Sequence, residues 1–280
     1  MDIETALKKG QLILKDSKIK SAELDSEILM SQAIRKDKKY IILNYNKKIK
    51  KKDLKYFDFL IQERVKKKPI AYLTKKKDFW KYEFFIDKNV LIPRPDTEVL
   101  VEQILELTKN KASMRILEIG VGSGCIILSI LKEKKKFFGI GIDISTQSLK
   151  ISEINSHKLG VNRRLKLFKS NIDNFNTGKY DLIISNPPYI NQYDLKYLEK
   201  DVLNFEPKLA LNGGQDGLSE IRKVIKKSSD LIKIKGKLIL EIGFDQKESV
   251  KRLLTKKGFY INKTIKDLAM NDRCIICTKI

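Results

Sequence analysis

Residues 115–124, Arg-Ile-Leu-Glu-Ile-Gly-Val-Gly-Ser-Gly, decide the fold class of this chain. An apolar run leads into three closely spaced glycines, and the apolar residues 126–128 continue beyond them. The pattern predicts a buried strand, a tight turn and the start of a helix. Glycine lets the backbone pass close to a ligand, and the first helical turn offers free N–H groups to it. This stretch is therefore expected to open a strand–helix–strand unit that binds a small molecule.

Apolar strands and helices alternate after this turn. A second strand over 138–142 ends at Asp143, and a helix is expected over 146–159. Such alternation is typical of a parallel sheet with helices on both faces. We therefore expect an α/β fold of the Rossmann-like kind. The further strands are expected at 165–168, 181–185, 236–242, 259–265 and 274–279.

The residues before the glycine turn have a different pattern. Residues 1–76 show helical periodicity, with a helix near 3–14, a second from Ser21 and a third that Asp53 is expected to cap. No catalytic pattern occurs there, which favours a helical substrate-docking domain. Residues 77–92 are expected to form a connecting β-hairpin that turns at 87–89. Residues 93–280 then form the catalytic domain.

The composition narrows the class of protein. The chain has 280 residues and a net charge of +23, from 58 Lys and Arg against 35 Asp and Glu. A polyanionic partner such as RNA and a general lysine-rich composition both explain this excess. No apolar run is long enough to span a membrane, and the N-terminus lacks a signal-peptide pattern. Three cysteines without a pairing pattern fit a reducing compartment, so we expect a cytoplasmic protein.

Asn186-Pro187-Pro188-Tyr189 follows the buried strand at 181–185. The two prolines end that strand and stiffen the backbone, which holds Asn186 at the strand's carboxyl end. In open α/β sheets ligands bind at this edge. The Asn186 side-chain oxygen and the Pro187 carbonyl are both acceptors, and together they could take both hydrogens of one planar NH₂ group. Tyr189 could pack its ring against that group. A simple strand-ending turn is the alternative.

The glycine turn favours one kind of cofactor. Its spacing differs from the dinucleotide pattern, and Glu118 makes the region negative. A ligand with a sulfonium and an amino group suits it better than a pyrophosphate, which favours S-adenosylmethionine. Asp143 lies at the position of a ribose-binding carboxylate, although Asp143 or Ser145 could instead cap the next helix.

No general base is evident in the sequence. His157 is the only histidine and lies in a polar helix. Neither a histidine nor a carboxylate with a perturbed pKa is assigned as a base, so we expect no bell-shaped rate profile between about pH 6 and 8.5. Cys274 and Cys277 are three apart on an expected strand and face opposite sides. We expect no metal site.

Three motifs together resemble those of the release factor glutamine methyltransferases. They are residues 92–98, Ile-Pro-Arg-Pro-Asp-Thr-Glu, residues 118–124, and residues 185–190, Ser-Asn-Pro-Pro-Tyr-Ile. The resemblance extends over almost the whole chain and includes residues 69–74, 205–207, 216–218 and 267–273. Adenine-N6 DNA methyltransferases share Asn-Pro-Pro-Tyr, and the segment at 93–98 separates the two families.

The resemblance implies a class I methyltransferase domain with a seven-stranded sheet whose last strand is antiparallel. It implies transfer of a methyl group from S-adenosylmethionine to the glutamine of the Gly-Gly-Gln motif in peptide chain release factors. The glutamine would be held by Asn186, Pro187, Pro188 and Tyr189, and we add Arg94 to these candidates. The cofactor would be held by Glu118, Gly120, Val121, Gly122, Ser123, Gly124, Asp143, Asn171, Ile172 and Asn186.

One departure concerns the adenine pocket, because relatives often have Asp followed by an aromatic residue where this chain has Asn171-Ile172. Two rival functions remain open from the sequence. One is an adenine-N6 nucleic-acid methyltransferase, and the other is a non-catalytic RNA-binding protein on a methyltransferase fold. We expect release factors as partners, no membrane, no sequence-specific nucleic acid, and either a monomer or an oligomer.

Overall fold

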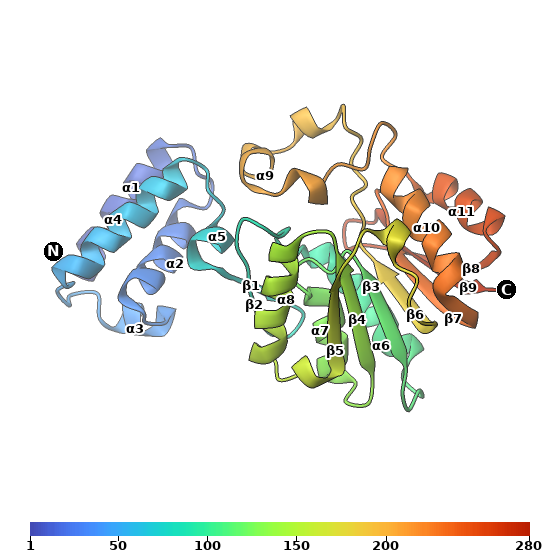
Figure 1. The fold of residues 1–280 in the computed structure, drawn as a ribbon. Helices are drawn as coiled ribbons and strands as arrows, with labels where there is room; N and C mark the ends of the chain where they lie inside the picture. The colour runs from blue at the N-terminus through green and yellow to red at the C-terminus, as the bar shows by residue number, and fades with distance from the viewer. The chain divides into compact units, whose positions relative to one another are not determined.

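A computed structural model describes all 280 residues, and the chain divides into two compact units (Figure 1). The first unit contains Met1–Lys76 and the short segment Glu199–Phe205. The second contains Lys77–Leu198 and Glu206–Ile280, and therefore both the glycine turn and the Asn-Pro-Pro-Tyr motif. None of the helices combines the length and the apolar character that crossing a bilayer requires.

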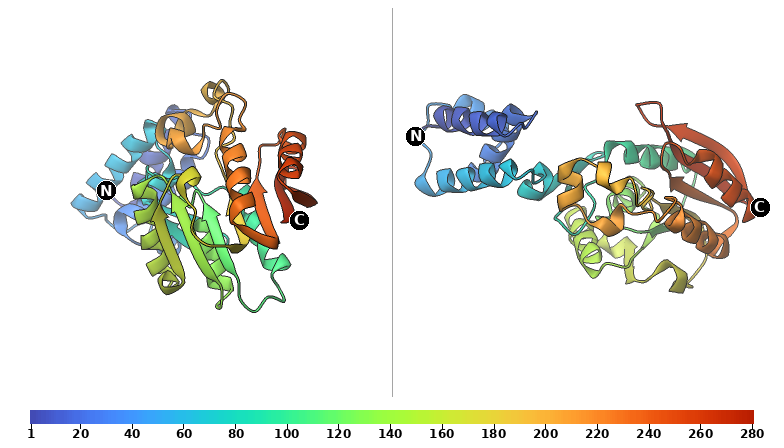
Figure 2. Two further views of the ribbon diagram at one scale, coloured as in Figure 1. Left: turned by 45° about the vertical axis from the view of Figure 1, so that its right-hand side comes forward. Right: turned by 90° about the horizontal axis from the view of Figure 1, so that it is seen from above.

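The first unit is a helical bundle around one apolar core. Helices α1 and α4 lie side by side (Figure 2), and Gly10 permits this approach because a Cβ there would lie 2.8 Å from the Phe57 ring. Asp2 and Asp37 cap α1 and α3, each accepting the N–H of the residue three positions later. The helices are α1 (Ile3–Asp16), α2 (Ala22–Ile34), α3 (Lys38–Leu43), α4 (Lys51–Val65), α5 (Ile70–Thr74) and α9 (Lys200–Phe205).

The start of α4 differs from the expectation. The helix begins at Lys51 with Lys50 in the cap position, so Asp53 lies inside the first turn and does not cap it. A carboxylate in the first turn still interacts favourably with the N-terminal end of the helix dipole. The apolar spacing thus predicts the helix correctly but not its first residue.

The hairpin also turns earlier than expected. Strands β1 (Lys76–Phe79) and β2 (Tyr82–Phe85) form a two-stranded sheet, so the turn lies at Trp80-Lys81 and not at 87–89. Trp80 adopts a left-handed backbone with φ 57°, and its N–H donates to the Glu98 carboxylate at 2.9 Å. This bond joins residues 18 positions apart, which a local pattern cannot reveal.

The second unit contains a seven-stranded sheet in the order β5-β4-β3-β6-β7-β9-β8. Neighbours from β5 to β7 run parallel, and β9 runs antiparallel to both β7 and β8. The expected Rossmann-like fold is therefore confirmed. The strands are β3 (Arg115–Ile119), β4 (Phe138–Asp143), β5 (Leu165–Lys169), β6 (Tyr180–Ser185), β7 (Ile232–Glu241), β8 (Phe259–Lys266) and β9 (Asp272–Lys279).

Helices cover both faces of this sheet (Figure 1). Helix α7 packs with α6 and α8, whereas α10 packs with α11. The chain builds β3, β4 and β5 in one direction and then returns to place β6 on the other side of β3. Ligands of open α/β sheets bind at such a switch point. The helices are α6 (Glu98–Leu107), α7 (Cys125–Glu133), α8 (Thr146–Lys158), α10 (Ser219–Leu231) and α11 (Lys247–Lys256).

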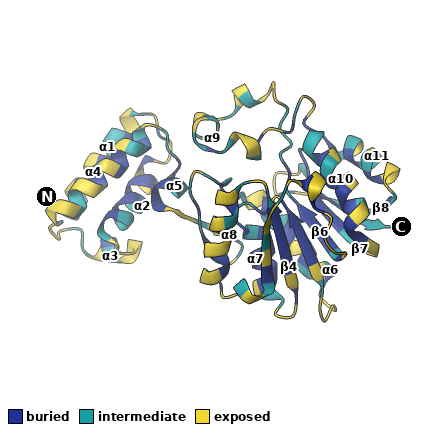
Figure 3. Cartoon of the chain, in the orientation of Figure 1, coloured by how far each residue is buried: buried dark blue, intermediate teal, exposed yellow.

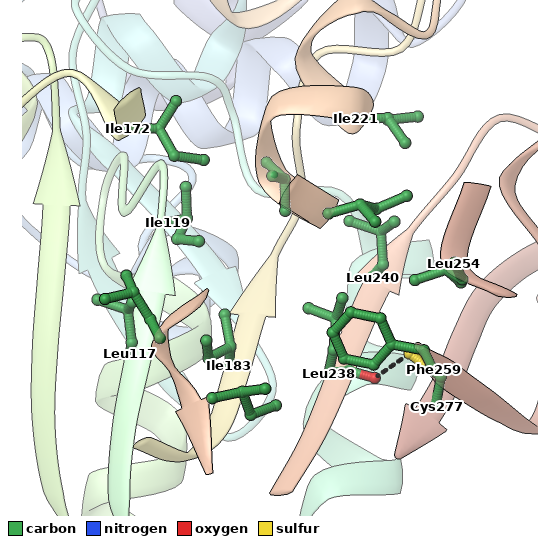
Figure 4. Packing of buried hydrophobic residues seen from close by; sticks show 14 of the residues in the cluster. Leu117, Ile119, Ile172, Ile183, Ile221, Leu238, Leu240, Leu254, Phe259 and Cys277 are labelled. Carbon is green, nitrogen blue, oxygen red and sulfur yellow. Dashed lines mark hydrogen bonds between the residues drawn. The ribbon is translucent and has the colours of Figure 1, made fainter. Parts of the chain in front are cut away.

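The central strands β3, β4 and β6 are buried on both faces (Figure 3), which explains their nearly continuous apolar runs. Leu117 and Ile119 of β3 belong to one core cluster with Ile221 of α10 and Leu254 of α11 (Figure 4). The alternate residue Glu118 faces α7, because its carboxylate accepts the N–H of Ile127.

A buried side chain of α8 joins the hairpin to the glycine turn. The Asn155 amide donates to the carbonyls of Phe85 and Ser123, both at 2.9 Å, and its oxygen accepts the Phe85 N–H at 2.7 Å. The residue has no exposed surface. Its amide thus replaces a missing backbone partner of β2 and fixes the turn that follows β3.

Replacing Asn155 with alanine should destabilise the fold by about 2–4 kcal/mol, because one buried and two half-buried backbone groups lose their partner. Denaturant unfolding would measure the loss. Ser156→Ala is the matched control, since Ser156 is also buried on α8 but donates only to Glu153 within its own helix. Equal destabilisation by the two substitutions would contradict the linking role of Asn155.

Candidate active site

A cavity of about 590 Å³ lies at the carboxyl ends of the parallel strands in the second unit. This volume is within the range of small-molecule sites in proteins, roughly 300–1,000 Å³. Residues from β3, β4 and β6 and from the turns that follow them line it. The cavity is therefore built from segments that are far apart in the sequence.

The ladder register decides which residues meet at this edge. Ile119 of β3 pairs with Ser185 of β6, and Ser185 pairs with Leu240 of β7. The next residue on each strand is Gly120, Asn186 or Glu241. These residues consequently reach the same level of the sheet, although more than 120 positions separate the first from the last.

The three glycines of the turn have two different roles. Gly120 and Gly122 line the cavity at φ +76° and +53°, and no heavy atom lies within 4 Å of a Cβ built on either. Gly124, at φ +79°, does not line the cavity, and its Cβ would lie 2.7 Å from Leu128. The structure therefore gives no support to a ligand contact by Gly124, and close packing at the start of α7 explains this glycine.

Two carboxyl groups lie beside the glycine turn, the buried Glu118 and the half-buried Asp143. Glu118 is 2% exposed, and burial raises its pKa well above the ordinary value, with Asp143 adding a smaller repulsive effect. The Asp143 carboxylate accepts the N–H of Gly122 at 3.0 Å and of Ser145 at 2.8 Å, while burial raises its pKa. Ser145, not Asp143, caps α8. Asp143 instead holds the glycine turn and faces the cavity.

The remaining cofactor candidates also line the cavity. They are Val121, Ser123, Asn171, Ile172 and Asn186. The Asn171 side chain accepts the Asp173 N–H at 3.1 Å and so begins a short 3₁₀ turn, which presents Ile172 as an aliphatic wall. Direct cofactor contact by these residues stays a prediction.

The Asn-Pro-Pro segment reaches the cavity, but its tyrosine does not. Asn186, Pro187 and Pro188 line the cavity. Asn186 donates through its side-chain Nδ2 to the Thr97 hydroxyl at 3.2 Å, and no protein group donates to its oxygen. Tyr189 instead packs on the apolar core that Figure 4 shows in part, and its hydroxyl lies 3.4 Å from Glu241 and 3.3 Å from Arg273. The structure thus gives no support to a contact between the Tyr189 ring and a substrate.

Arg94 lines the cavity, but a partner within the protein already holds it. Its guanidinium forms an ion pair with Glu206 at 2.5 Å, and Glu206 also accepts the Ile92 N–H at 3.1 Å. The carboxylate of Glu206 therefore ties the stiff segment at 92–95 to the chain after α9. Substrate binding by Arg94 stays a prediction, and the structure adds a local positioning role.

The sequence analysis missed Glu241. This residue ends β7, is 2% exposed, and has one carboxyl oxygen, Oε2, without a hydrogen-bond partner. Burial raises its pKa from 4.5 to about 7, and interactions with Thr97 and Arg273 oppose that rise. The sequence analysis assigned no perturbed carboxylate as a base, and the structure adds Glu241 as a carboxyl group with a raised pKa. An acidic residue inside the apolar run at 238–242 was the available signal.

Two family models match the chain. Residues 5–74 match the PrmC N-terminal domain, and residues 95–204 match the methyltransferase small domain. Two solved structures are similar in fold to the chain. They are a methyltransferase from Pyrococcus furiosus (TM-score 0.55, 18% identity, 78% of this chain and 97% of that one) and a ribosomal protein L11 methylase from Lactobacillus delbrueckii subsp. bulgaricus (TM-score 0.52, 17%, 73% and 90%).

Two curated relatives of the same name are similar to the chain over their full length. The chain is 37% identical to a release factor glutamine methyltransferase of Clostridium acetobutylicum, covering 100% of this chain and 99% of the relative. Identity to the protein of the same name from Buchnera aphidicola subsp. Baizongia pistaciae is 36%, with 100% of both chains covered. With its helical first unit and its methyltransferase fold, this chain belongs to the release factor glutamine methyltransferase family.

Proposed function

We propose that this protein methylates the side-chain amide nitrogen of the glutamine in the Gly-Gly-Gln motif of release factors, with S-adenosylmethionine as the donor. The full-length relatives carry the name of this activity, which supports the choice of substrate class. Release factors as partners would give the enzyme a cytoplasmic site of action.

The orientation of Asn186 is the observation that carries the proposal. Its amide nitrogen is engaged by Thr97, so its oxygen is left as an acceptor at the cavity wall. The Pro187 carbonyl is likewise without a protein donor, and Pro187 lines the same cavity. A primary amide carries two hydrogens in one plane, and two acceptors side by side suit it.

The residues of the glycine turn fit S-adenosylmethionine. The open space beside Gly120 and Gly122 leaves room for a ligand directly against the backbone. Glu118 and Asp143 provide carboxyl oxygens for a cationic amino group and for hydroxyls. The Arg94 charge is balanced by Glu206, and the remaining charged side chains of the lining are of both signs, with Asp143 at the glycine turn and Lys208, Glu220 and Lys223 on later segments.

The cofactor supplies a methyl group on a sulfonium, whose leaving group is a neutral thioether. The protein then has to position and polarise the nucleophile. By accepting both hydrogens, Asn186 and Pro187 would fix the plane of the amide and raise electron density on its nitrogen. The prolines restrict the backbone so that both acceptors keep their direction. After the methyl group has been transferred, the amide nitrogen loses one of its own protons to water.

Radiolabelled methyl transfer to purified release factor, DNA and RNA in parallel would test the proposal. Label on the release factor, lost when its Gly-Gly-Gln glutamine is replaced, is the expected result. Label on DNA or RNA alone would support an adenine-N6 methyltransferase, because an adenine amino group also presents two hydrogens to the same acceptors.

We propose that the first unit binds the folded substrate protein. Tyr56 and Phe59 on α4 stack with ring centroids 6.3 Å apart, and they are 40% and 54% exposed. Exposed aromatic pairs are typical of protein-binding surfaces. A flexible glutamine loop offers little binding energy by itself, so remote contacts would supply it.

Gly120→Ala should abolish cofactor binding with a modest loss of stability, about 1–2 kcal/mol, because only the positive φ is strained. Gly124→Ala is the matched variant. It carries the same strain plus a clash with Leu128, so its unfolding free energy should fall further. Calorimetry and denaturant unfolding measure both effects. If Gly120→Ala binds the cofactor normally, the ligand does not approach the turn as proposed.

Asn186→Ala should remove methyl transfer and leave cofactor affinity nearly unchanged, because the proposed bonds go to the substrate amide. Single-turnover kinetics with radiolabelled cofactor and calorimetry would measure the two quantities. Transfer at close to the wild-type rate would show that Asn186 is not the acceptor.

Replacing Tyr56 and Phe59 together with serine should raise KM for intact release factor at least tenfold and leave cofactor affinity unchanged. Activity on a short Gly-Gly-Gln peptide should change little, since the peptide lacks the remote contacts. Phe138→Ser is the control, because Phe138 is 55% exposed at the start of β4, the end opposite the cavity. An unchanged KM in the double variant would leave α4 without a docking role.

A further inference from the structure

Glu241 is a buried carboxyl group to which the proposed reaction assigns no task. It stands level with Asn186 in the sheet but does not line the cavity. Its Oε2 atom has no hydrogen-bond partner. A buried carboxyl oxygen without a partner is unfavourable, and such a group calls for a specific explanation.

The hydroxyl groups of Tyr189 and Thr97 lie near this carboxyl group. The Tyr189 hydroxyl lies 3.4 Å from its Oε1 atom. The Thr97 hydroxyl is near enough to favour the charged form of Glu241, and it also receives the Asn186 amide at 3.2 Å. Thr97 is 3% exposed, so water does not compete for its hydroxyl. Glu241 and Thr97 are buried, Asn186 beside them is half-buried, and the three side chains form a cluster in which Asn186 donates to Thr97.

The direction of hydrogen bonding along this chain determines what Asn186 presents to the cavity. A hydroxyl has one hydrogen, and it accepts from a neighbour most readily when that hydrogen points elsewhere. If Thr97 donated to Asn186, the amide would turn and present its NH₂ group to the cavity. The NH₂ group of Asn186 would then face the NH₂ group of the substrate, and two donors cannot form a hydrogen bond with each other.

We propose that Glu241 is a positioning residue, which draws the Thr97 hydrogen toward itself and so keeps the Asn186 oxygen directed at the substrate. The proposal rests on the proposed function, because it explains how the acceptor in that reaction is oriented. It adds a residue outside the cavity whose charge state controls the acceptor.

The groups around Glu241 allow this charge state to change near neutral pH. Burial raises its pKa to about 7, the nearby Asp96 carboxylate adds to that rise, and the Arg273 guanidinium opposes it. The other titratable neighbours, Tyr189 and the thiols of Cys125 and Cys274, have pKa values raised by burial and stay neutral.

The direction of the pH effect depends on whether the Glu241 carboxyl group carries a proton. Ionised Glu241 can only accept, so the Thr97 hydrogen points toward it. Protonated Glu241 carries a hydrogen of its own, which it can give to Thr97, and the Thr97 hydrogen is then free to turn to Asn186. Activity should therefore fall as the pH drops through about 7.

The pH dependence of kcat/KM on intact release factor tests this control. For a single group with a pKa of about 7, the ionised fraction, and with it the wild-type value, should fall about tenfold from pH 8 to pH 6. Glu241→Gln keeps an acceptor oxygen but cannot titrate, so its value should change less than about twofold over the same range, with cofactor affinity retained. An acidic limb of the same size in Glu241→Gln would overturn the proposal.

A pair of substitutions tests whether the Thr97 hydroxyl orients Asn186. Thr97→Val removes the hydroxyl at constant shape, and Thr97→Ser retains it. The serine variant should be at least tenfold faster in kcat than the valine variant, with similar cofactor affinity in both. Equal rates would show that the hydroxyl does not orient Asn186.

Thermal unfolding provides a readout that does not depend on activity. A carboxyl whose pKa is higher in the folded than in the unfolded state binds its proton more tightly when folded. It therefore contributes less to stability as the pH rises from about 4.5 to 7. The Tm of wild type relative to Glu241→Gln should accordingly decrease between pH 5 and pH 8.

These measurements separate the two proposals. If the wild type methylates no release factor, the proposed function fails, and the Tm comparison still decides whether Glu241 titrates in this range. Parallel Tm curves would overturn the inference about Glu241 even if the enzyme proves active.

Discussion

The site depends on the register of three parallel strands. Ile119, Ser185 and Leu240 pair in one row across β3, β6 and β7, so each strand ends at the same level. The residues that follow are a glycine, an amide and a carboxyl group. A one-residue slip would turn every side chain to the opposite face, and the buried core on both faces prevents it. The cavity, the acceptor and the carboxyl group behind it all follow from this register.

Burial of charge is the second constraint. Glu118, Asp143 and Glu241 come from three strands and are held in three ways. Glu118 accepts one backbone N–H from α7, Asp143 accepts one from the glycine turn and one from the residue that caps α8, and Glu241 has no backbone donor but lies near side-chain hydroxyls and the Arg273 guanidinium. The backbone partners of Asp143 favour its charged form, which suits a fixed binding group. Glu241 has weaker support, and burial leaves its pKa near neutrality.

The local sequence pattern predicted the strands of the seven-stranded sheet, the glycine turn and the Asn-Pro-Pro-Tyr segment. It did not predict the contacts that hold the ends of these elements together. The apolar runs at 115–119 and 181–185 correctly indicated β3 and β6, since strands buried on both faces need such runs. The hairpin turn was misplaced because Trp80 is held by Glu98. Gly124 was assigned to the ligand because spacing alone cannot separate a glycine at a cavity from one under a packed leucine.

The sequence by itself determined the fold class, the family and the chemical character of the acceptor, because periodicity and short motifs are local properties. The tertiary structure alone decided the partners of each functional group. It turned the Tyr189 hydroxyl away from the cavity, joined Arg94 to Glu206, and brought Glu241 behind Thr97 and Asn186. The hydrogen bonds of Tyr189 with Glu241, of Asn186 with Thr97 and of Arg94 with Glu206 join residues 52, 89 and 112 positions apart. Only the folded sheet sets those distances, so the pKa of Glu241 and the direction of the Asn186 amide are properties of the fold.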